Sequence, residues 1–343
     1  MEKHSYQYEG VFEFEAGGRL ENLRIAYHTT SSRTTEDGRQ KPVVWICHAL
    51  TANSDAEDWW PQLVGAGKLI DPARYFIVCV NMLGSPYGSS SPSSINPETG
   101  RPFYFDFPMV TVRDIVKANI LVRQHLGIDH IDMIIGSSIG GFQAVEWLVM
   151  EPEIIRKAVL LATSCRTTPW LTAWNEAMRM ALEADPSFRA CESLEGGAAA
   201  LKAARAIGML SYRSYEGYNL TQPESDPDVI FPDRAASYQR YQGKKFAARF
   251  DAYSYWYLCF SVDSNNVGRR RGGCASALAR VKAECTVVGI DSDRILPLVE
   301  QQFIAAHIPG AVFHRISSQF GHDGFLLETE QITSIVEPIL NSL

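Results

Sequence analysis

No stretch of this 343-residue sequence is apolar for long enough to cross a lipid bilayer. The first ten residues, MEKHSYQYEG, lack the apolar segment of a secretory signal. An excess of positive charge is missing too, because 32 lysines and arginines stand against 39 aspartates and glutamates, for a net charge of −7. These absences argue against nucleic acid or an anionic membrane as the main partner.

Paired cysteine motifs are absent as well. The seven cysteines are an odd number, none of them forms a C-x-x-C pair, and Cys47, Cys79 and Cys259 lie in apolar runs. Such cysteines are typical of reduced, buried side chains in a cytoplasmic protein. We expect neither a bound metal ion nor a bound cofactor.

Apolar patterns in the sequence predict a mostly parallel β-sheet. Residues 11–15 and 23–27 alternate apolar and polar side chains, which is typical of antiparallel strands with one face in water. The other expected strands are nearly continuous apolar runs: Pro42–His48, Tyr75–Val80, Ile131–Ile135, Ala158–Ala162, Cys285–Ile290 and Ala311–Ile316. Helical patterns such as residues 111–125 lie between strands, and this alternation predicts a parallel sheet with helices on both faces.

The alternation of strand and helix stops in residues 169–280. This segment is rich in aromatic and helix-forming side chains and contains no convincing buried strand. We therefore expect a core built from residues 1–168 and 281–343, with an inserted helical cap at residues 169–280 over the carboxyl edge of the sheet. Residues 328–340 predict a closing amphipathic helix.

A turn of small residues follows the expected strand 131–135. It reads Gly136-Ser-Ser-Ile-Gly140, a G-x-S-x-G pattern with Ser138 at its centre. Glycine is needed where a turn is too tight for a Cβ atom, and the central residue of such a turn is strained. The pattern is typical of the nucleophile elbow of α/β-hydrolases, although a plain strand–loop–helix connection has the same composition. The predicted fold is an α/β-hydrolase fold with a mostly parallel, eight-stranded sheet.

An acid and a histidine are expected later in the chain, because the triad of an α/β-hydrolase runs in the order serine, acid, histidine. Asp291 and Asp293 both follow the expected strand 285–290, and we favour Asp293 because it starts a turn that ends at Pro297. Either aspartate could instead cap a helix. His322 follows the last expected strand between glycines, and we expect it to be the catalytic base.

Backbone N–H groups are expected to bind the oxyanion of the reaction. One belongs to the residue after the nucleophile, Ile139, and the other to the loop after the third strand, where Leu50 is the favoured donor. His48 starts the same loop. Because it precedes the elbow and so breaks the chain order of the triad, we interpret it as structural.

Together these residues resemble the homoserine O-acyltransferase (homoserine O-acetyltransferase) family of the α/β-hydrolase superfamily. The resemblance extends over nearly the whole chain and is far more specific than G-x-S-x-G alone. Outside the elbow it is carried by His48–Thr51, Asn81–Gly84, Ser91–Pro97, Phe107–Asp114, Leu126–Ile128, Ala204–Arg205, Leu210–Ser214, Tyr238–Phe246, Phe250–Asp251, Ser254–Tyr255, Gly268–Gly272 and Gly321–Leu326.

The resemblance implies acyl transfer by a ping-pong mechanism. Ser138, with His322 and Asp293, would take an acetyl group from acetyl-CoA and pass it to the hydroxyl of L-homoserine, in methionine biosynthesis. The cap would keep water away from the acyl-enzyme. Acetyl-CoA would be a co-substrate and not a bound cofactor, and the resemblance suggests a homodimer formed through the cap.

The amino acid needs groups that bind its carboxylate and its ammonium. By resemblance these are Arg205 and Asp323, and a guanidinium suits a carboxylate because it can form two parallel hydrogen bonds. Tyr212 and Thr51 are implied as further substrate-binding residues. Tyr212 would share a helix face with Arg205 if the helix continues that far.

Other arginines are further candidates for substrate binding. Arg179 is a weaker candidate for the carboxylate site. Arg269 to Arg271 could meet CoA phosphates, although an exposed basic turn is the favoured interpretation.

The sequence departs from the family pattern near the expected acyl pocket. Ser137 replaces the usual glycine before the nucleophile, Ile139 a methionine after it, Ala52 a glycine, and Ser85-Pro86 a Gly-Cys pair. Succinyl-CoA as donor and serine as acceptor therefore stay open as alternatives, since one methylene changes pocket binding by only about 1–3 kcal/mol. A carboxylesterase is less favoured because it needs no clamp for an amino acid, and the intact triad disfavours a non-catalytic binding protein.

Overall fold

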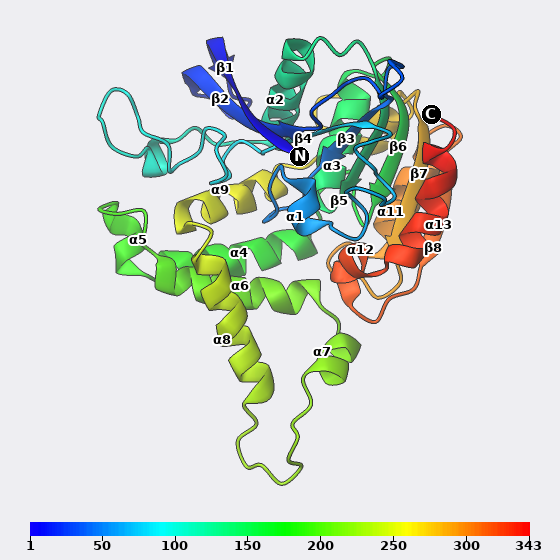
Figure 1. Ribbon diagram of the computed structural model, residues 1–343. Coiled ribbons are helices and arrows are strands. Elements are labelled where there is room, and N and C mark those ends of the chain that lie inside the picture. The colour runs from blue at the N-terminus through cyan, green and yellow to red at the C-terminus, as the bar shows by residue number, and fades with distance from the viewer.

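The computed structural model describes residues 1–343, and one eight-stranded β-sheet lies at its centre (Figure 1). The strands follow the spatial order β1-β2-β4-β3-β5-β6-β7-β8. Strands β1, β2 and β4 pair antiparallel, and all pairs from β4 to β8 are parallel. The bounds are β1 (Glu2–Glu13), β2 (Arg19–Thr29), β3 (Val43–Cys47), β4 (Phe76–Val80), β5 (Ile131–Ser137), β6 (Ile155–Leu161), β7 (Glu284–Ile290) and β8 (Val312–Ile316). The predicted sheet is confirmed.

The two antiparallel strands extend well beyond the predicted residues 11–15 and 23–27. The inner positions of β1, such as Tyr6 and Tyr8, are only partly buried and alternate with exposed residues. Tyrosines that alternate with polar residues give only a weak hydrophobic pattern, so the sequence predicts only the last residues of β1 as a strand.

Helices cover both faces of the sheet. Side chains of β3 alternate between two buried clusters, with Trp45 in the larger cluster and Val44 and Ile46 in the smaller. The larger cluster also takes residues from α2 (Val112–His125), α3 (Ile139–Met150) and α11 (Leu298–His307). The smaller one takes residues from α1 (Ala56–Trp59) and α13 (Thr329–Leu340). Three further short helical elements are η1 (Tyr104–Asp106), η2 (Gly321–Asp323) and α12 (Gly324–Leu327).

All residues between β6 and β7 that form regular structure are helical. The helices are α4 (Pro169–Glu183), α5 (Pro186–Ala190), α6 (Ala198–Tyr212), α7 (Tyr215–Thr221), α8 (Arg234–Ala247), α9 (Ala252–Asp263) and α10 (Cys274–Leu278). We call residues 169–280 the helical insertion. Figure 1 shows α4 and α6 below the sheet, and α7, α8 and the loop between them pointing away from it. The division of the chain into a core and a separate cap stays a prediction.

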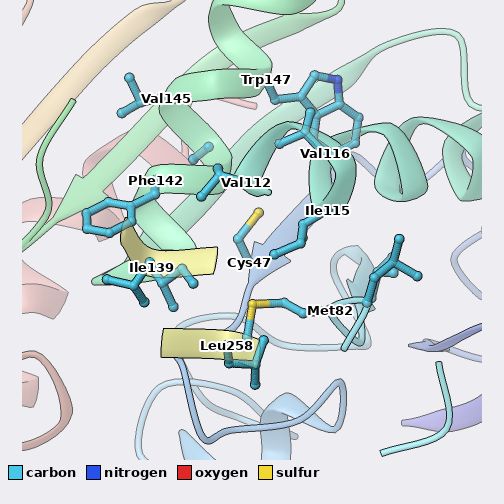
Figure 2. Packing of buried hydrophobic residues seen from close by; sticks show 14 of the residues in the cluster. Cys47, Met82, Val112, Ile115, Val116, Ile139, Phe142, Val145, Trp147 and Leu258 are labelled. Atoms are coloured by element: carbon cyan, nitrogen blue, oxygen red, sulfur yellow. The ribbon is translucent and has the colours of Figure 1, made fainter. Parts of the chain in front are cut away.

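The helical insertion packs into the same apolar cluster as the sheet. Leu258 of α9 belongs to the larger cluster together with Met82, with Cys47 of β3 and with Phe142 of α3, as Figure 2 shows. All four side chains are 2% exposed or less, so they exclude water at the boundary between the insertion and the sheet. Burial of this kind is the main source of stability in proteins.

Two arginines at the end of the helical insertion form ion pairs with the rest of the chain. The guanidinium of Arg271 lies 2.6 Å from the carboxylate of Glu146 on α3, which also pairs with Arg113 at 2.9 Å. Arg269 lies 2.6 Å from Glu15. The interpretation of Arg269 to Arg271 as an exposed basic turn, or as a site for CoA phosphates, is therefore wrong for Arg269 and Arg271, because both are half-buried and already paired.

Removing the shared carboxylate should destabilise the protein strongly. The Glu146 side chain is only 3% exposed, so Glu146→Ala leaves the charges of Arg113 and Arg271 without their common partner. We expect the free energy of unfolding, measured by urea denaturation, to fall by about 3–5 kcal/mol. The control is Glu153→Ala, which breaks an exposed pair with Lys282 and should cost less than about 1 kcal/mol. Equal losses in the two variants would contradict a structural role for the buried network.

Candidate active site

The predicted elbow joins the end of β5 to the start of α3, and Ser138 sits at its tip. Ser138 has φ of 57° and ψ of −128°, a conformation that side chains other than glycine rarely adopt. A Cβ atom on Gly136 would collide with the carbonyl of Gly140, and one on Gly140 would collide with the carbonyl of Cys47. Both glycines are therefore required by the backbone, as the sequence pattern indicates.

The Ser138 side chain faces a cavity of about 220 Å³ between the carboxyl edge of the sheet and the helical insertion. Most of the twenty lining residues are apolar. The structure brings eight residues predicted from the sequence to this one cavity: Ser138, Ile139, Leu50, Thr51, Arg205, Tyr212, His322 and Asp323. These residues come from the β3–α1 loop, the elbow, α6 and η2, so four separate parts of the chain meet there.

Asp293, and not Asp291, meets His322. The Nδ1–H of His322 donates to Asp293 Oδ2 at 2.5 Å, and both side chains are almost fully buried. Asp293 Oδ1 accepts from the N–H groups of Ile295 and Leu296, so this aspartate also caps a turn, as the alternative interpretation proposed. Asp291 lies at the strand end and pairs with Arg315.

The surroundings of His322 stabilise its protonated form. Burial alone would lower the pKa of the imidazole, because it disfavours the charged ring. The charge and hydrogen bond of Asp293 and the charge of Asp323 outweigh burial, so the net pKa of His322 lies above its ordinary value. A histidine held in this way can accept a proton and keep it near a negative partner.

His48 has a structural role. It is completely buried, its Nδ1–H donates to the carbonyl of Ala49, and its Nε2 accepts from the N–H of Met82. Burial lowers its pKa to about 4, so the ring stays neutral at physiological pH. The side chain therefore braces the loop that carries Leu50, in agreement with the structural interpretation.

Arg205 has free hydrogen-bond donors at the cavity. Its Nε and Nη1 atoms are buried and have no hydrogen-bond partner within the protein. The guanidinium lies over the rings of Phe246, at 4.9 Å, and Tyr212, at 5.7 Å. Helix α6 does extend to Tyr212, which explains how the two side chains meet. Buried donors without a partner are costly, so this site is built for an acceptor group that enters from outside.

Asp323 supplies negative charge to the same cavity. Burial raises the pKa of its carboxyl, while Arg213, His322 and Arg205 oppose that rise. The Nε–H of Arg213 donates to Asp323 Oδ2 at 3.1 Å. The cavity thus holds a carboxylate and an unpartnered guanidinium, which together suit a small zwitterion.

Arg179 is not available at the cavity. Its Nη1 lies 2.6 Å from Asp263 and its Nη2 lies 2.6 Å from Glu176, and it is absent from the cavity lining. Its suggested role as an alternative carboxylate site is therefore contradicted, because both of its ends are already paired.

Two candidate functional residues are not predicted from the sequence. Arg249 lines the cavity, and its Nη1–H donates to the carbonyl of Thr51 at 2.6 Å and to the hydroxyl of Tyr87. Arg213 binds Asp323 from the α6–α7 junction. Both arginines lie in or beside segments that carry the family resemblance, and that position is the only signal the sequence offers.

Comparison with known proteins first defines the class. A family model described as alpha/beta hydrolase fold matches residues 42–329. Among solved structures, an acetylester hydrolase from Corynebacterium glutamicum has a TM-score of 0.86 at 25% identity, with 99% of this chain and 96% of that chain covered. The fold is therefore that of an α/β-hydrolase.

Closer similarity defines the family within that class. A homoserine O-acetyltransferase from Cyclobacterium marinum is 38% identical, with 98% of this chain and 95% of the relative covered. The crystal structure of a homoserine O-acetyltransferase from Staphylococcus aureus has a TM-score of 0.81 at 30% identity, covering 99% of this chain and 95% of that chain. This chain belongs to the homoserine O-acetyltransferase family. No helix in it combines the length and the apolar character needed to cross a membrane.

The pairing of His322 with Asp293 can be tested by following histidine titration by NMR. We expect His322 to titrate above the ordinary value of about 6.5, and His48 to stay neutral down to about pH 4. In Asp293→Asn the counter-charge is lost while burial remains, so the pKa of His322 should fall. The matched variant Asp291→Asn should leave the pKa of His322 unchanged. A fall in Asp291→Asn instead would transfer the partnership to Asp291.

Proposed function

We propose that this protein transfers an acetyl group from acetyl-CoA to the hydroxyl of L-homoserine, giving O-acetyl-L-homoserine and CoA. One observation carries the proposal: the cavity that holds Ser138 and His322 also holds Asp323 and the unpartnered guanidinium of Arg205. An amino acid carries the two opposite charges that such a site can bind. The relatives from Cyclobacterium marinum and Staphylococcus aureus are homoserine O-acetyltransferases, which supports the same substrates for this chain.

The first half of the proposed reaction forms an acyl-enzyme. His322 Nε2 accepts the proton of Ser138 as its Oγ attacks the thioester carbonyl, and Asp293 holds the opposite ring nitrogen. The N–H groups of Leu50 and Ile139 stabilise the oxyanion. The C–S bond then breaks, and CoA leaves with the proton that His322 releases to its sulfur.

The second half passes the acetyl group to the acceptor. His322 takes the proton of the homoserine hydroxyl, whose oxygen attacks the acyl-enzyme, and the proton returns to Ser138 as the ester bond to the enzyme breaks. Water would give hydrolysis at this stage. The helical insertion covers the cavity as a lid in this proposal and lowers the access of water to the ester. O-acetylation would activate homoserine for methionine biosynthesis.

The acceptor is positioned through its two charges. Arg205 binds the carboxylate with its free N–H groups, and Asp323 binds the ammonium. Tyr212 and Thr51, which line the same cavity, complete the site. A simple esterase does not need to bind an amino acid, so the presence of Arg205 and Asp323 favours an amino acid over water as the acceptor.

The walls of the cavity favour acetyl over succinyl as the acyl group. Most of the lining side chains are apolar, including Ile139, Phe142 and Leu171. A succinyl group brings a second carboxylate, which needs a cationic partner. Arg205 is assigned to the acceptor, and Arg249 is already bound to Thr51 and Tyr87.

A thiol-release assay tests the reaction directly. With acetyl-CoA and homoserine, we expect continuous CoA release and formation of O-acetylhomoserine, and much slower release with succinyl-CoA, or with serine or water as the acceptor. Ser138→Ala should lower turnover by about 10³-fold or more, because the nucleophile is lost. Ser137→Ala is the matched control, since the buried Ser137 hydroxyl has no hydrogen-bond partner and is absent from the cavity lining. Equal CoA release with water and homoserine would identify a hydrolase instead.

We also propose that two copies associate through the helical insertion. Large apolar side chains are exposed on and between α7 and α8, among them Tyr215 at 74%, Ile230 at 82% and Phe231 at 85%. Apolar groups gathered on one part of a surface mark interaction sites. The cytoplasmic location expected from the sequence stays a prediction.

Sedimentation velocity tests the dimer. We expect the unaltered protein to sediment as a dimer, and Phe231→Asp to weaken association by about tenfold or more, because a charge would enter an apolar contact. The control is Val299→Asp on α11, which changes a side chain that is 62% exposed on another surface. A monomer at micromolar concentration would refute the proposal.

A further inference from the structure

The junction between α6 and α7 packs directly against the segment that carries His322. We call residues 212–217 the junction and residues 317–323 the histidine loop. The hydroxyl of Ser214 donates to the carbonyl of Gln319. A Cβ atom on Gly321 would lie 2.9 Å from both the Tyr212 carbonyl and the Ser214 nitrogen, so the two backbones are in close contact. The helical insertion therefore contacts the loop of the candidate catalytic histidine through its backbone.

Arg213 is the positively charged residue of this junction. Its guanidinium donates to Asp323 at 3.1 Å and lies 5.4 Å from the ring of Tyr238. Arg213 does not line the cavity, whereas Asp323 does. Arg213 thus contacts Asp323 without itself lining the cavity.

We propose that Arg213 is a positioning residue that holds the Asp323 carboxylate toward the cavity as the partner for the ammonium group of the acceptor amino acid. The inference rests on the proposed function. No step of the reaction uses Arg213 itself. Arg213 acts through Asp323, mainly on the binding of the acceptor and secondarily on His322, whose pKa the Asp323 charge helps to raise.

Electrostatics gives this arrangement a dependence on pH. Burial raises the pKa of Asp323 and so favours its neutral form, which cannot pair with an ammonium group. Arg213, His322 and Arg205 oppose that rise. Tyr212 and Tyr218 also lie within the range of the Asp323 charge, but their own pKa values are raised by burial, so they stay neutral and add no charge. Without Arg213, Asp323 should become neutral at a higher pH.

The test compares acceptor kinetics of Arg213→Ala and Arg213→Lys across pH. For Arg213→Ala, we expect the kcat/KM for homoserine to fall by about ten- to a hundredfold at the acidic end of the pH range, mainly through KM, because a neutral Asp323 cannot pair with the ammonium group. The loss should be smaller at higher pH, where a larger fraction of Asp323 is ionised. Arg213→Lys should recover most of the activity. Arg240→Ala, which removes an exposed pair with Asp233 on the same insertion, is the matched control and should change nothing.

A double-mutant cycle separates positioning from general damage. In the Asp323→Asn background, the change Arg213→Ala should cost little more, because its effect acts through the carboxylate. A loss that is equal at every pH, is not recovered by lysine, or is undiminished in the Asp323→Asn background would overturn the inference. If the unaltered enzyme releases no CoA in the presence of homoserine, the proposed function fails instead, which is a separate result.

Discussion

The contact between the elbow and the end of β3 is the constraint on which the site depends. Gly140 lies so close to the carbonyl of Cys47 that no other residue fits there. This contact places Ser138 next to the loop that follows β3, so that Leu50 and Ser138 line the same cavity. His48 braces that loop from within the core. The relative positions of Ser138 and Leu50 are therefore fixed by backbone packing and do not depend on flexible side chains.

The parts of the site that the sequence predicts correctly are those encoded locally. Buried strands are continuous apolar runs, a tight turn needs glycines, and the polar residues that follow parallel strands must meet at one edge of the sheet. These rules alone predict that Ser138, Asp293 and His322 lie at the same edge of the sheet. The antiparallel edge is predicted less well, because β1 gains its order from pairing with β2 more than from burial.

Pairings between distant residues are the parts that the sequence does not predict. Arg271 pairs with Glu146, Arg179 with Asp263, and Arg213 with Asp323, and each pair joins residues more than eighty positions apart. An arginine looks the same in a sequence whether it faces a ligand, a buried carboxylate or water. Only the fold distinguishes these cases, and among the cavity arginines it leaves Arg205 as the one with buried donors that lack a partner.

The single cavity has a kinetic consequence for the proposed reaction. Ser138, Arg205 and Asp323 line one cavity of about 220 Å³, so in the proposed reaction the acyl group of the donor and the amino acid would share this space. An amino acid that binds before acylation blocks the donor, and a donor that returns after acylation blocks the amino acid. An excess of either substrate should then inhibit the binding of the other, and the rate of the reaction would be greatest at a balanced ratio of the two.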